Sequence, residues 1–107
     1  MNHQPNPMNK QAAAYAVLSA LTQTHGHLPA PYVTVHTYGT TTVDLQLNTP
    51  QEFEAWRSAL LVPTESVDIK SGSGRSWLAA NAVFHGVALR LAGDCAAIVA
   101  EPSAVAA

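Results

Sequence analysis

The chain has 107 residues, of which 48% are hydrophobic and 11% are charged, and its formal net charge is −2 at pH 7. A chain of this length forms one domain and buries roughly two-thirds of the surface that the unfolded chain exposes. Because binding to nucleic acid depends on neutralising phosphates, the small negative net charge disfavours a nucleic-acid partner.

Cysteine content and apolar runs indicate where the protein works. Cys95 is the only cysteine, so no internal disulfide forms and a reducing, cytoplasmic setting is expected. The longest apolar runs are interrupted by Asn81, His85 and Gly86. They fall well short of the roughly 20 residues that span a bilayer, so we expect no membrane partner.

Charged residues are distributed unevenly along the chain. Between Lys10 and Glu52 the only formal charge is Asp44. A free-standing domain normally spreads charge over its solvated faces, so this uncharged half indicates a surface that meets a partner.

The first predicted element is a helix from Asn9, as its N-cap, to about Thr24, with Gly26 after its end. Its core-facing stripe consists of Ala14, Val17, Leu18 and Leu21. Another face carries Ala12, Ala16 and Ala20 at steps of four. These alanines are either good helix formers at exposed positions or a small-residue ridge that lets a second helix, for instance from another subunit, approach closely.

A β-hairpin is predicted over residues 31–48. Its alternating apolar residues are Val33, Val35, Val43, Leu45 and Leu47. A three-residue loop at 39–41 keeps them on one face, setting Val35 opposite Leu45 and, on the outer face, His36 directly opposite Asp44.

The second helix carries the most specific local signal in the chain. Thr49 is the expected N-cap, Pro50 the first helical residue, and Glu52 reaches back to complete a capping box. This helix is expected to run from Pro50 to about Leu61. Its buried residues are Phe53, Trp56 and Leu60.

Three further strands are predicted, with a five-residue loop at 71–75 and a turn at 81–83. This register gives a core face of Val67, Ile69, Trp77, Val87, Leu89 and Leu91. The other face then carries an apolar patch of Leu78, Ala80, Phe84 and Ala88, flanked by Lys70 and Arg90. Either residues 95–99 cover this patch or it is a binding surface.

The expected fold is α+β, a two-layer sandwich of order α-β-β-α-β-β-β, with helices on one face of an antiparallel sheet. A single domain over residues 9–100 follows a disordered lead-in at 1–8 and precedes a frayed tail at 101–107.

His36 and Asp44, with Tyr32 on the same open face, form the main polar group. A carboxylate that orients an imidazole is part of a catalytic relay, but an exposed cross-strand pair looks the same in sequence. No serine or cysteine is placed as a nucleophile, so no catalytic residue is assigned.

Two other patterns suggest ligands. His25 and His27, with His36, are possible metal ligands, yet histidines after a helix C-terminus also interact with the helix dipole. Residues 71–75 could hold a phosphate, but a strand follows rather than the required helix, which favours a hairpin loop. We therefore expect no metal and no cofactor.

Three segments, Pro29–His36, Glu52–Trp56 and Trp77–Ala80, resemble landmarks of small uncharacterised proteins found in actinobacteria and their phages and mobile elements. The resemblance implies an accessory protein of a mobile element or its host. It transfers no functional residue, because that group has no established activity.

The sequence therefore predicts a non-enzymatic interaction module that docks on a protein partner or on itself as a homodimer. The expected surface consists of Ala12, Ala16, Ala20, Leu78, Phe84 and Arg90. The alternative is a small-ligand-binding or hydrolytic domain that uses the outer sheet face around Tyr32, His36 and Asp44.

Overall fold

The computed structural model describes residues 7–37 and 39–95. Its elements are the 3-10 turn η1 (Met8–Gln11), α1 (Ala12–Thr24), β1 (Tyr32–His36), β2 (Thr42–Leu47), α2 (Pro50–Ala59), the 3-10 turn η2 (Thr64–Ser66), β3 (Asp68–Gly72), β4 (Arg75–Phe84) and β5 (Val87–Asp94). The predicted α+β class and element order are confirmed. The expected tail at 101–107, most of the expected lead-in and the possible cover at 96–99 lie outside the described residues.

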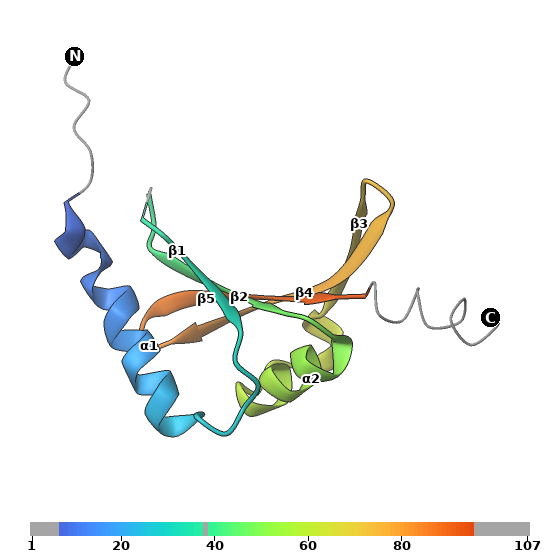
Figure 1. The fold of residues 1–107 in the computed structure, drawn as a ribbon, viewed down its shortest axis with the longest axis horizontal. Coiled ribbons are helices and arrows are strands. Elements are labelled where there is room, and N and C mark those ends of the chain that lie inside the picture. Colours follow the sequence, from blue (N-terminus) through green and yellow to red (C-terminus); the bar gives the residue numbers. More distant parts are fainter. Residues whose placement is uncertain (1–6, 38, 96–107) are drawn as a thin grey trace, which may run out of the picture.

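The sheet has the strand order β1-β2-β5-β4-β3. Three neighbouring pairs are antiparallel as predicted, whereas β2 and β5 pair in parallel. In Figure 1 the tips of the β1–β2 and β3–β4 hairpins rise on the side away from α2. The sheet is therefore curved, and its open face is concave.

The two helices begin in different ways. The Thr49 side chain accepts a 3.1 Å hydrogen bond from the Glu52 N–H, and the Glu52 carboxylate accepts one of 3.0 Å from the Asn48 N–H, which confirms the predicted cap of α2. Asn9 is not the cap of α1. It lies within η1, and among the described residues no side chain caps the start of α1.

One core joins the helices to one face of the sheet. Its buried residues are Ala14, Val17, Leu21, Val43, Leu45, Leu47, Phe53, Trp56, Val62, Ala80, Val87, Leu89 and Leu91. At the centre of this core, Phe53 of α2 packs directly on Gly93 of β5. The approach is so close that a Cβ added at Gly93 would lie 2.5 Å from the Phe53 Cβ. Any larger residue at Gly93 would push α2 away from the sheet.

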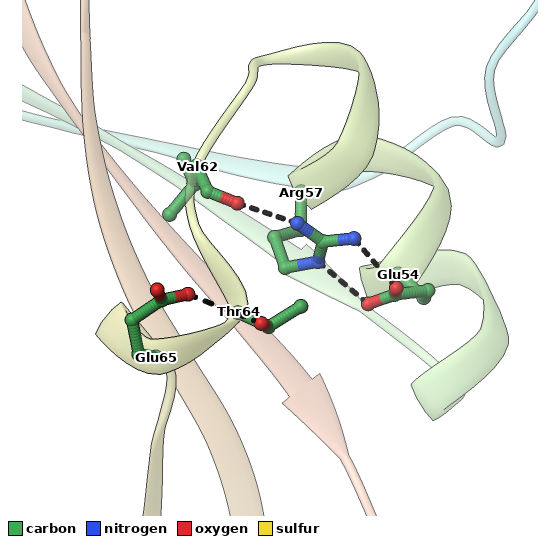
Figure 2. A network of polar contacts seen from close by, with 5 residues as sticks. All are labelled: Glu54, Arg57, Val62, Thr64 and Glu65. Carbon is green, nitrogen blue, oxygen red and sulfur yellow. Dashed lines mark hydrogen bonds and ion pairs between the residues drawn. The ribbon is translucent and has the colours of Figure 1, made fainter.

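A polar network connects the end of α2 to the segment that leads to β3 (Figure 2). The Arg57 guanidinium donates two 2.7 Å hydrogen bonds to the Glu54 carboxylate and one of 2.5 Å to the Val62 carbonyl. The hydrogen bond from Arg57 holds the pKa of Glu54 below its usual value. Arg57 thus ties the last turn of the helix to the chain that leaves it.

The first hairpin differs from its predicted register by two residues. Val35 pairs with Val43 and His36 with Thr42, so the loop spans residues 37–41. A shift of two preserves the face of every side chain, and the alternating apolar residues still point toward the helices.

The register predicted for the last three strands is wrong. Ser73 and Gly74 form a two-residue turn with φ of 54° and 76°, and His85 and Gly86 form another with φ of 50° and 79°. Such turns match the twist of paired strands. The three-residue turn at 81–83 does not exist.

This error moves side chains to the opposite face of the sheet. Leu78 and Phe84 lie on the helix side, where they pack against the core, and Ala80 is buried there. Trp77 instead lies on the open face, paired with Lys70 and Asp94. The predicted outer patch of Leu78, Ala80 and Phe84 is therefore wrong, because a one-residue change in register inverts the faces.

Candidate functional site

The polar group on the open face centres on Asp44 in β2. His36 Nε2 donates to Asp44 Oδ2 across 3.0 Å, so the predicted pair is in contact, although diagonally rather than directly opposite. Arg90 is directly opposite Asp44 in the parallel β2–β5 pair, and its Nε lies 3.5 Å from Oδ1. Oδ1 is enclosed yet has no hydrogen-bond partner among the described residues.

The pair matches two members of a catalytic relay, in which a carboxylate orients an imidazole. Within the described residues, no serine or cysteine side chain forms a hydrogen bond with His36 as the third member. Tyr32, the third member of the predicted polar site, is 72% exposed and pairs with Gln46. As an exposed cross-strand contact, the His36–Asp44 pair contributes about 0.2–1 kcal/mol to stability.

A hollow of about 510 Å³ lies on the open face. Charged residues of three strands line it, including Asp44, Asp68, Lys70 and Arg90. The half-buried Trp77 also contributes to its wall. Sequence reasoning placed this tryptophan in the core, and only the correct register of β3 and β4 reveals it here.

The β1 edge is the second candidate surface. Among the described residues β1 pairs only with β2, so its other side is not bonded to a neighbouring strand. Four of its five residues are exposed, and Val33, on the helix side, is 38% exposed. The strand contains no Asp, Glu, Lys or Arg.

An apolar groove of about 400 Å³ runs beside this edge on the helix side. It lies between α1, the segment at 25–31 and β1. Its wall includes Leu18, Leu21, Leu28, Pro31, Val33 and Trp56. The Trp56 indole N–H donates a 2.7 Å hydrogen bond to the carbonyl of Pro29, which holds this lining segment in place.

The sequence does not identify this edge, because it does not determine the order of the strands in the sheet. A signal was nevertheless present, since β1 lies within the long stretch whose only formal charge is Asp44. The lack of charge indicates a partner surface, but the sequence pattern places that surface on the first helix and on the outer sheet face.

The other predicted surface residues occupy separate places. Ala12 and Ala16 are exposed on α1 and Ala20 is half-buried, so the alanine ridge is accessible over part of its length. Arg90 lies on the open face, away from Leu78 and Phe84.

The structure places the three histidines that were weighed as metal ligands, His25, His27 and His36, in no common metal site within the described residues. His25 stacks on Trp56 and meets Phe84 edge-on, with ring centroids 6.3 and 5.8 Å apart. Over residues 7–37 and 39–95, no three His, Cys, Asp or Glu side chains gather as metal ligands would. Over the same ranges, neither helix has the length and apolar character needed to cross a bilayer.

Comparisons with protein-family models, with curated proteins and with solved structures find no match. The resemblance to small proteins of actinobacteria and mobile elements therefore stays a prediction.

Proposed function

We propose that this protein is a non-enzymatic protein-interaction module that binds an extended polypeptide segment along the β1 edge. One observation carries the proposal. An exposed edge strand without formal charge lies directly beside an apolar groove. This combination is what strand addition requires.

Each part of the surface has a role in such binding. Free backbone N–H and C=O groups along an edge strand bond to an added strand and supply affinity. Because side chains alternate, every second residue of the added strand faces the helix side, next to Val33 and the groove. An apolar residue at those positions would bury surface against Leu28 and Pro31.

The hollow on the open face supports a second candidate, the binding of a small polar ligand. Asp44 and Arg90 line it, and the Oδ1 atom of Asp44 lacks a hydrogen-bond partner among the described residues. Replacing Arg90 with Gln would weaken such a ligand without affecting a segment bound at β1, because β5 lies two strands away from the β1 edge.

The experiment selects short random peptides for binding to the immobilised full chain. We expect the selected peptides to alternate apolar and polar residues. Val33→Lys should weaken their binding about tenfold, since a charge would then line the groove.

Ile69→Lys is the matched control. Ile69 is also an exposed β-branched residue on the helix side of an edge strand, but it lies on β3. Its replacement should leave peptide binding unchanged. Peptides that bind wild type and the Val33→Lys variant equally would contradict the proposal.

A further inference from the structure

We infer that the segment bound at the β1 edge is β1 of a second copy, paired antiparallel about a two-fold axis at Thr34. The inference rests on the proposed function and names its partner. A closed two-fold dimer uses the same surface on both copies, so that surface must be complementary to itself. The β1 strand meets this requirement in register, packing and charge.

The register follows from the faces of the strand. Directly opposite residues in an antiparallel pair point to the same face, so a residue on the helix side must meet another on that side. Val33 and Val35 lie on the helix side, because they pair with Leu45 and Val43. Full overlap then sets Thr34 opposite itself and Val33 opposite Val35 of the second copy.

The packing in this register is favourable on both faces. On the helix side, Val35 of the second copy covers Val33 at the wall of the apolar groove. On the open side, the exposed Tyr32 lies opposite His36 of the second copy. Aromatic and β-branched cross-strand pairs of this kind stabilise paired strands.

Charge distinguishes β1 from the other edge of the sheet. No Asp, Glu, Lys or Arg occurs in β1, and His36 is already bonded to Asp44 of its own chain. On β3 the equivalent pairing would set Lys70 opposite Lys70, because that residue is the middle of the strand. Like charges directly opposite are destabilising, so the full-overlap register available to β1 is disfavoured for β3.

The dimer joins five strands of each copy into one continuous sheet. A two-fold axis perpendicular to the sheet keeps both helical layers on one side and both open faces on the other. The apolar grooves of the two copies then meet at the central pair of β1 strands.

The first measurement is native mass spectrometry of the full chain, where we expect twice the monomer mass of 11.3 kDa. Val33→Lys should shift the protein to monomer, and the matched Ile69→Lys should remain dimeric. Ala16→Glu should also remain dimeric, which separates the β1 edge from the alanine ridge of α1.

Cysteine cross-linking tests the register. In a Cys95→Ser background, Thr34→Cys should form a covalent dimer under mild oxidation, because directly opposite Cα atoms lie about 4.5–5.5 Å apart. Tyr32→Cys is the control. Its two copies would be separated by about 13 Å along the strands, too far for a disulfide.

The outcomes separate the inference from the proposed function. A monomer that still binds alternating peptides in a Val33-dependent way would overturn the dimer and retain strand addition. A monomer without such binding would overturn both. A dimer that survives Val33→Lys but dissociates with Ala16→Glu would assign self-association to α1 and reject the β1 pairing.

Discussion

The two edges of the sheet differ in charge and in the surface that lies beside them. The β1 edge is uncharged and lies beside an apolar groove, whereas β3 carries Asp68 and Lys70 and ends in a two-residue turn. Both strands have five residues, and both are largely exposed. Exposure alone therefore does not identify a docking edge; the charges and the neighbouring surface do.

The largest effect is expected from a substitution in the core, which stabilises both edges of the sheet. Phe53→Ala removes the ring that seats α2 on Gly93, and the loss of a buried phenylalanine costs about 3–5 kcal/mol. Urea unfolding should show this loss. Hydrogen exchange should then increase at both β1 and β3, since neither edge has a core of its own. Protection lost at one edge alone would show that the two edges are supported separately.

A second substitution acts on the β3 side alone. Gly74 has φ of 76°, and alanine in this left-handed region costs about 1–2 kcal/mol. Gly74→Ala should lower the free energy of unfolding by this amount and increase exchange in β3. The solution mass should not change, because the turn is remote from β1. A Gly74→Asn variant, which tolerates this conformation better, should lose less stability.

A third prediction tests whether the charges on β3 prevent this edge from pairing with another strand. Replacing Asp68 and Lys70 together with threonine makes this edge resemble β1. Light scattering should then detect species larger than the dimer, because both edges could accept a strand. If the double variant keeps the mass of wild type, charge is not what protects β3.

The smallest effect concerns pH. The pKa of Glu54 is lower in the folded chain because Arg57 donates to its carboxylate. The stabilisation is therefore complete above the unfolded pKa and is lost as pH falls through the lowered folded value. Glu54→Gln should reduce this acid dependence slightly in thermal unfolding. Because Arg57 also bonds to Val62, the change should affect the approach to β3 and leave dimerisation unaltered.

Local signals predicted most of the fold. The cap formed by Thr49 and Glu52 depends on residues close in sequence, and it was predicted with its hydrogen bonds. The faces of β1 and β2 followed from period-two alternation. The failure lay at Ser73–Gly74 and His85–Gly86, whose two-residue turns lack the asparagine or aspartate that usually marks them.

The polar site was predicted only in part, for the same reason. His36 and Asp44 lie on two strands of one hairpin, so their contact could be inferred from the sequence. Arg90 joins them through the parallel pairing of β2 with β5, which no local pattern specifies. Strand order also determines which strands are edges, and the role of β1 depended on it.

The parallel pairing of β2 with β5 has a consequence for folding kinetics. The two hairpins and β5 can form from contacts close in sequence, but β2 meets β5 only after the intervening α2, β3 and β4 have been positioned. Contacts between strands so far apart in sequence form slowly, so this junction is expected to limit the folding rate. Until this junction forms, the β1–β2 hairpin has two unpaired edges, one on β1 and one on β2. Both edges could then pair with strands of other chains.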